Sequence, residues 1–79
     1  MTERRQSPRR KVLKGARIAF ADEGIACTVR NLSANGAGLD VPNALSLPPS
    51  FMLVIERDGF MRRCRPVWCN ERRVGVAFD

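Results

Sequence analysis

The chain has 79 residues, 44% of them hydrophobic, and a formal net charge of +6. A chain of this length forms one small domain and leaves little room for a large catalytic cleft. It contains no histidine, so the usual general base for a serine or cysteine nucleophile is missing, and we expect neither enzymatic activity nor catalytic residues.

The basic charge is concentrated at the start of the chain. Residues 1–14 hold six basic residues and one acidic residue, a net charge of +5, whereas residues 15–79 are close to neutral. Residues 1–11 show no hydrophobic periodicity and include Pro8, which opposes both a helix and a paired central strand. We therefore predict a flexible basic arm over residues 1–11. Most of its charged groups are guanidinium groups, which bind phosphate through paired hydrogen bonds and also pair with guanine edges.

Short segments of alternating hydrophobicity follow the arm. Residues 12–20 alternate imperfectly, because Lys14 interrupts the apolar face. Residues 25–30 alternate cleanly and place Ile25, Cys27 and Val29 on an inward face. Further strands are predicted at residues 37–41, 51–57, 60–68 and 74–78.

Turn signals separate these segments. Asp22-Glu23-Gly24, Asn35-Gly36 and Asp58-Gly59 are predicted to reverse the chain, since glycine accepts the backbone angles that tight turns require. Residues 42–50 contain three prolines and are predicted to form a loop. Pro66 lies inside a predicted strand, which indicates an edge position or a bulge.

Six short strands without a segment of helical period predict an all-β fold, a small six-stranded antiparallel barrel over residues 12–79. Trp68 and the thiols of Cys27, Cys64 and Cys69 are expected to pack inside it. Because histidine and a second cysteine pair are missing, we expect no metal site. No run approaches the roughly 18 apolar residues of a membrane span, and the N-terminus lacks a signal-peptide core, so we expect a cytoplasmic protein without membrane insertion.

The candidate ligand-binding residues belong to two motifs and are Arg4, Arg5, Arg9, Asn31, Ser33 and Gly36. Arg5 and Arg9 form an Arg-x-x-x-Arg motif in the arm. The second motif, Asn-x-Ser-x-x-Gly, ends one strand and turns into the next. Because residues two apart in an extended chain project to the same side, Asn31 and Ser33 are predicted to form a polar ledge that Gly36 leaves open. Such a pair of motifs favours a guanine nucleotide with phosphates.

These motifs, in this order and ahead of a short β-barrel, resemble the PilZ domain, the bacterial receptor module for cyclic di-GMP. The resemblance covers essentially the whole chain and includes the ending Gly75-Val76-Ala77-Phe78. It implies a cyclic di-GMP receptor or adaptor that needs no other cofactor, orders its arm on ligand binding and signals to a protein effector.

The resemblance also implies the role of each motif residue. Arg5 and Arg9, assisted by Arg4, would hold the phosphates and guanine faces of cyclic di-GMP. Asn31 and Ser33 would form hydrogen bonds with the guanine. Many family members have aspartate at the position of Asn31. Asparagine is an accepted variant, and it brings donor and acceptor groups without a negative charge.

Two other functions stay open. One is a barrel without ligand binding that acts as a protein-interaction module, and the other is a small barrel that binds nucleic acid through its basic arm. The near-neutral body, the lack of tyrosine and the core positions of the phenylalanines predict no stacking platform, so nucleic acid is the less favoured partner. In a purely structural interpretation, Asn31 and Ser33 bond only to the local hairpin backbone, and the arm is a solvated tail.

Overall fold

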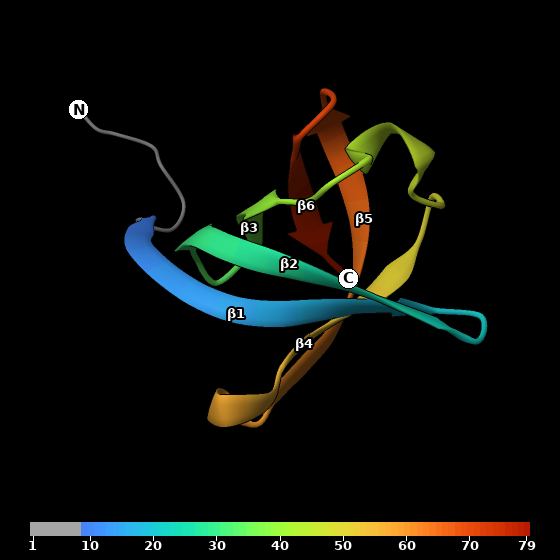
Figure 1. Ribbon diagram of the computed structural model, residues 1–79. Coiled ribbons are helices and arrows are strands. Elements are labelled where there is room, and N and C mark those ends of the chain that lie inside the picture. Colours follow the sequence, from blue (N-terminus) through green and yellow to red (C-terminus); the bar gives the residue numbers. More distant parts are fainter. Residues whose placement is uncertain (1–8) are drawn as a thin grey trace.

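The computed structural model describes residues 9–79, which form a closed barrel of six antiparallel strands (Figure 1). The strands are β1 (Arg10–Phe20), β2 (Glu23–Leu32), β3 (Gly36–Asp40), β4 (Phe51–Ile55), β5 (Phe60–Cys69) and β6 (Arg73–Phe78). Around the barrel they follow the order β1-β2-β3-β6-β5-β4. The predicted all-β, six-stranded antiparallel barrel is therefore confirmed.

Every strand contributes apolar side chains to the barrel interior. The buried core consists of Ile18, Cys27, Val29, Ala37, Leu39, Val41, Ala44, Phe51, Leu53, Ile55, Cys64, Val74 and Val76. The alternation in β2 is as predicted, since Cys27 and Val29 are buried while Ala26 and Arg30 are exposed. The alternating pattern of the sequence thus determines which face of each strand lines the core.

Two pairings that are distant in sequence close the barrel. Residues Arg17 to Ala19 of β1 pair with β4, and β3 pairs with β6 along its whole length. The long β3–β4 connection crosses one end of the barrel and contains the short 3-10 helix η1 (Ala44–Ser46). Val41 and Ala44 of this connection are buried, and their backbone amides donate to the carbonyls of Arg72 and Glu71 at 2.8 and 3.0 Å. The connection therefore seals the core at this end.

The hairpin turns lie near their predicted positions but differ in length. The β1–β2 turn consists of Ala21, with φ of 50°, and Asp22, so Gly24 belongs to β2 and the turn begins earlier than predicted. The β4–β5 turn contains the 3-10 helix η2 (Glu56–Asp58) and then Gly59, whose φ of 64° requires glycine. The expected hairpin is present there, with four residues in its connection rather than two.

Three strands contain bulges, at Lys11/Lys14 in β1, Val29/Asn31 in β2 and Pro66/Trp68 in β5. For Pro66 the structure selects the bulge from the two predicted alternatives. A bulge places two residues opposite one, and this reverses the inside and outside alternation of the strand beyond it. The three bulges therefore determine which of the side chains beyond them face outward.

Some expectations about individual residues are wrong. Trp68 is 52% exposed and lies on the outer surface rather than in the core. Cys27 and Cys64 are buried as predicted, whereas Cys69 is exposed at the end of β5. In both cases the strand end beyond the Pro66 bulge has left the barrel interior.

The predicted arm, residues 1–11, overlaps the start of β1. Strand β1 begins at Arg10, two residues before the predicted start. Residues 1–8, with Arg4 and Arg5, lie outside the described residues. Within the described part of the chain, no helix has the length and apolar character needed to cross a membrane.

Candidate functional site

Arg9 connects the chain before β1 with the polar motif of β2. Its Nη1 atom donates to Oδ1 of Asn31 at 2.5 Å. The register explains the contact, because Arg10 lies opposite Leu32 and Lys11 opposite Asn31. Arg9, the residue directly before β1, therefore lies beside Asn31, and the two sequence motifs meet through these two members.

The β2 bulge turns Asn31 toward the outer surface. Val29 lies opposite Leu39, and both side chains are buried. Asn31 lies opposite Gly38, whose neighbours in β3 point into the core. Without the extra residue at Arg30, Asn31 would follow Val29 into the interior. The bulge therefore makes the amide of Asn31 available on the barrel wall.

Ser33 has a different position from the one predicted. Its Oγ atom accepts hydrogen bonds from the backbone amides of Asn35 at 3.3 Å and Gly36 at 3.2 Å, and it lies 3.3 Å from the Gly36 carbonyl, to which it donates. The hydroxyl thus fixes the conformation of the β2–β3 turn. The Ser33 hydroxyl is thus bonded to the local hairpin backbone, while the amide of Asn31 is engaged by Arg9.

Gly36 is the first residue of β3 and does not occupy a left-handed turn position. A Cβ atom at this position would lie 2.2 Å from the carbonyl oxygen of Val76 on β6. Real Cβ atoms do not approach a backbone oxygen so closely, so glycine is needed for the contact between β3 and β6. The sequence predicted that Gly36 leaves open space beside the ledge. The structure adds a second reason for glycine at this position, which is the close contact between β3 and β6.

Two further glycines lie on the outer wall next to Asn31, and both are buried beneath neighbouring side chains. Gly38 and Gly75 are direct neighbours across β3 and β6, and Gly75 lies opposite Trp68 on β5. The side chain of Asn31 covers Gly38, with Nδ2 2.6 Å from the position of a Cβ atom, and the indole of Trp68 covers Gly75, with Nε1 2.1 Å from that position. We call this row of Asn31, Gly38, Gly75 and Trp68 the glycine floor.

The sequence analysis missed Gly38, Gly75 and Trp68 as site residues. The Pro66 signal for a bulge was present, but the proline does not show which way Trp68 turns after it. The pairing of β3 with β6, which brings the two glycines together, is a long-range contact that local patterns do not reveal.

An ion-paired cluster lies two residues beyond the glycine floor. Asp40 of β3 is paired with Arg73 of β6, and its Oδ1 lies 2.9 Å from Nε of Arg73. Its Oδ2 accepts a hydrogen bond from Nη1 of Arg30 at 3.2 Å. Two cations and one anion give this part of the wall a net positive charge.

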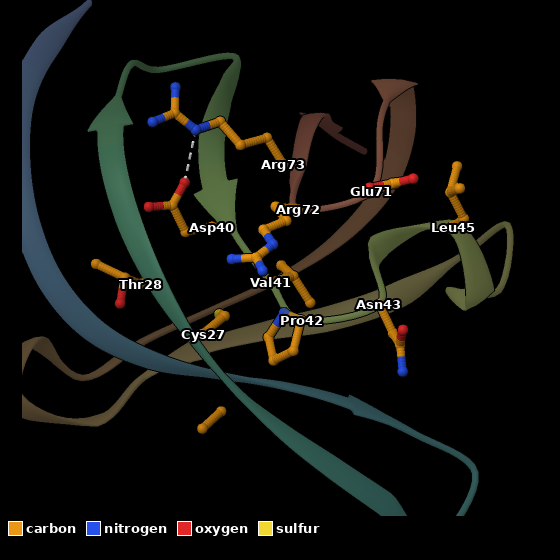
Figure 2. Close-up of a pocket in the computed structure, with 11 residues that line it drawn as sticks. Cys27, Thr28, Asp40, Val41, Pro42, Asn43, Leu45, Glu71, Arg72 and Arg73 are labelled. Carbon is orange, nitrogen blue, oxygen red and sulfur yellow. Dashed lines mark ion pairs between the residues drawn. The ribbon is translucent and has the colours of Figure 1, made fainter.

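A hollow of about 1050 Å³ opens at the Asp40 end of the wall (Figure 2). It exists because the pairing of β2 with β3 stops at Thr28 and Asp40, and the chain from Val41 onward bonds to the β5–β6 turn instead. None of the described motif residues lines it. Cys27 lies on its inner side, and burial, together with the nearby Cys64, raises the pKa of the Cys27 thiol to about 11. That thiol is protonated at neutral pH and is a poor nucleophile.

The chemistry offered by the site is that of hydrogen bonding, charge and flat apolar contact. Within residues 9–79, no three cysteine, aspartate or glutamate side chains gather in a way that would hold a metal ion. The outer wall instead presents an arginine, an amide and an indole, and the two glycines lie beneath the amide and the indole. These groups suit a planar polar ring that carries negative charge.

Comparison with curated proteins gives no match to this sequence. Comparison with family models gives a match to the PilZ domain over residues 3–79. Because this match extends over nearly the whole chain and the structure has the all-β barrel expected from the motifs, the protein belongs to the PilZ domain family.

Proposed function

We propose that the protein binds cyclic di-GMP on the outer wall formed by β2, β3, β6 and β5, and that its N-terminal arginines close over the bound nucleotide. PilZ domains are in general receptor modules for cyclic di-GMP and bind rather than transform their ligand. The observation that carries the proposal is the contact of Arg9 with Asn31. It joins the arginine motif to the polar motif on one surface.

The glycine floor provides the place for a guanine ring. The side chains of Asn31 and Trp68 cover Gly38 and Gly75, so a guanine ring reaches the two glycines when these side chains swing aside. The amide of Asn31 lies over Gly38 and offers a donor and an acceptor to the polar edge of guanine. The indole of Trp68 lies over Gly75 and offers an aromatic surface.

The arginines supply the charge that the phosphates require. Arg9 is placed next to Asn31, and Arg4 and Arg5 precede it by a few residues in the chain. Guanidinium groups bind phosphate oxygens in pairs and also pair with O6 and N7 of guanine. Ser33 acts through the shape of the β2–β3 turn, which its hydroxyl stabilises.

Ligand binding orders the arm and makes a new surface for a protein effector. Fixing one residue costs roughly 1–2 kcal/mol of backbone entropy, whereas a hydrogen bond to a charged group contributes about 1.5–3 kcal/mol. The favourable free energy of several arginine contacts therefore exceeds the entropic cost of ordering a few residues by a small margin. We expect a modest affinity, in the micromolar range.

Calorimetric titration with cyclic di-GMP tests the proposal. The wild-type protein is expected to bind cyclic di-GMP and not GTP. The Arg5→Ala/Arg9→Ala variant is expected to lose at least about 100-fold in affinity, equivalent to about 2.7 kcal/mol, because two charge-assisted contacts are removed.

The matched control is Arg57→Ala, which removes an exposed arginine from the β4–β5 turn and is expected to bind like wild type. Thermal unfolding of all variants should stay within a few degrees of wild type, since Arg9 is exposed. Wild-type affinity in the double variant would refute the assignment of the arginine motif. Absence of heat with the wild-type protein would refute nucleotide binding and favour a pure protein-interaction module.

A second candidate function is supported by Trp68. Its exposure of 52% provides the aromatic stacking surface that the sequence analysis did not predict. Together with the basic arm, it resembles the combination that single-stranded nucleic acids require. Binding of single-stranded DNA with a steep salt dependence, and without preference for cyclic di-GMP, would support this function over the first.

A further inference from the structure

The cluster of Arg30, Asp40 and Arg73 belongs to the same wall as the glycine floor. Gly38 and Gly75 are paired, and so are Asp40 and Arg73, two residues further along the same two strands. Two residues of a strand span about 7 Å, a distance that an arginine side chain covers. All three members of the cluster are reachable from solvent, with side chains 45%, 33% and 54% exposed in the order given.

The guanidinium of Arg73 extends toward the floor. In Figure 2 it lies beyond Asp40, on the side of the β2–β3 turn, and the guanidinium of Arg72 points the other way, although Asp40, Arg72 and Arg73 all line the hollow. Arg73 thus belongs to the wall that carries Asn31. Arg30 faces outward by the regular alternation of β2, directly before Asn31, which the bulge turns to the same surface.

Asp40 holds the two arginines by weak contacts. Its Oδ1 is shielded from solvent and accepts no hydrogen bond from residues 9–79, although Nε of Arg73 lies 2.9 Å away. Its Oδ2 accepts a bond of 3.2 Å from Arg30, which is long for a hydrogen bond between charged groups. A phosphate group that offers two well-aligned acceptors to one guanidinium is a better partner than this carboxylate.

We infer that Arg73, supported by Arg30, forms a phosphodiester-binding subsite next to the glycine floor, and that Asp40 holds both arginines there until the ligand arrives. The inference rests on the proposed function, because the ligand reaches this subsite from the floor. A cyclic dinucleotide has two phosphodiester groups on opposite sides of its ring. The N-terminal arginines bind one of them, and Arg73 binds the other.

Calorimetric titration of cyclic di-GMP into cluster variants tests the inference. Arg73→Ala is expected to weaken binding about tenfold, equivalent to about 1.4 kcal/mol, and Arg30→Ala is expected to weaken it by a smaller factor. Asp40→Asn is expected to strengthen binding several-fold, because the arginines lose a competing anion while the side chain keeps its size.

The matched control is Arg65→Ala. Arg65 is also an exposed arginine of the barrel surface, and it pairs with Asp79 at 3.0 Å, but it is remote in register from Asp40. It is expected to change affinity less than twofold. Thermal unfolding of each variant verifies that the barrel is intact, and Arg73→Gln, which preserves most of the side-chain length, replaces Arg73→Ala if the latter unfolds.

The outcomes separate the two proposals. Wild-type affinity in folded Arg73→Ala or Arg73→Gln overturns the subsite and leaves the proposed function standing. A wild-type protein that gives no heat with cyclic di-GMP overturns both. Weaker binding in the arginine variants together with tighter binding in Asp40→Asn supports the subsite, since a purely structural role of the ion pairs predicts the same direction for all three substitutions.

Discussion

Gly36 shows how a single residue of a binding motif also serves the fold. Its missing side chain is required by β6, since a Cβ atom would lie 2.2 Å from the carbonyl oxygen of Val76. That oxygen belongs to the backbone of a paired strand and has little freedom to move. The motif glycine would therefore be needed at this position even in a barrel that binds no ligand.

Substitution of Gly36 by alanine is expected to destabilise the protein by about 1–3 kcal/mol, the usual cost of overpacking. For a domain of this size, this lowers the midpoint of thermal unfolding by at least about 4 °C. Gly15→Ala is the matched control, because no atom lies within 4 Å of the position of its Cβ and its φ is not positive. There the midpoint should stay constant or rise slightly, as alanine reduces the entropy of the unfolded chain. Equal effects of the two substitutions would contradict the steric account.

At the scale of strands, the bulges limit what the sequence could predict. The alternation of β2 and the closure into a barrel were predictable, because a half-buried strand needs a period of two and exposed strand edges are unfavourable. The bulge at Arg30 leaves no trace in composition, and it decides that Asn31 faces outward. The bulge after Pro66 was signalled by proline, yet the exposure of Trp68 depends on the register with β6. Sequence patterns thus located Asn31 without revealing the floor beside it.

The position of Trp68 on β5 gives the protein an intrinsic reporter. It is the single tryptophan of the chain, it is half exposed, and it lies over Gly75 on the proposed floor. Binding of cyclic di-GMP is expected to change its fluorescence emission with the same midpoint as the calorimetric titration, because a guanine ring comes into contact with the indole. The Arg5→Ala/Arg9→Ala variant should show no change. Calorimetric binding with unaltered emission would place the guanine away from β5 and β6.

At the scale of the whole molecule, closure of the barrel brings thiols from different walls into one apolar interior. Cys27 belongs to β2 and Cys64 to β5, on strands that are not neighbours, and both are buried. Burial raises the pKa of each thiol from 9.0 to about 11, and the charge of Cys64 adds to the effect on Cys27. Deprotonation of either residue inside the barrel is therefore opposed by the fold as a whole.

The raised pKa values of the two buried thiols predict that the stability of the protein decreases at alkaline pH. Below pH 9.0 both thiols are protonated in the folded and in the unfolded chain, and their contribution to stability is fully present. Between pH 9.0 and about 11 the unfolded chain loses these protons while the barrel retains them, so the free energy of unfolding decreases, by about 1.4 kcal/mol for each pKa unit of difference. Chemical denaturation at several pH values under reducing conditions measures the slope. Cys27→Ala and Cys64→Ala should each reduce it, whereas Cys69→Ser, at the exposed cysteine, should leave it unchanged. An equal slope in all three variants would assign the alkaline loss of stability to other groups.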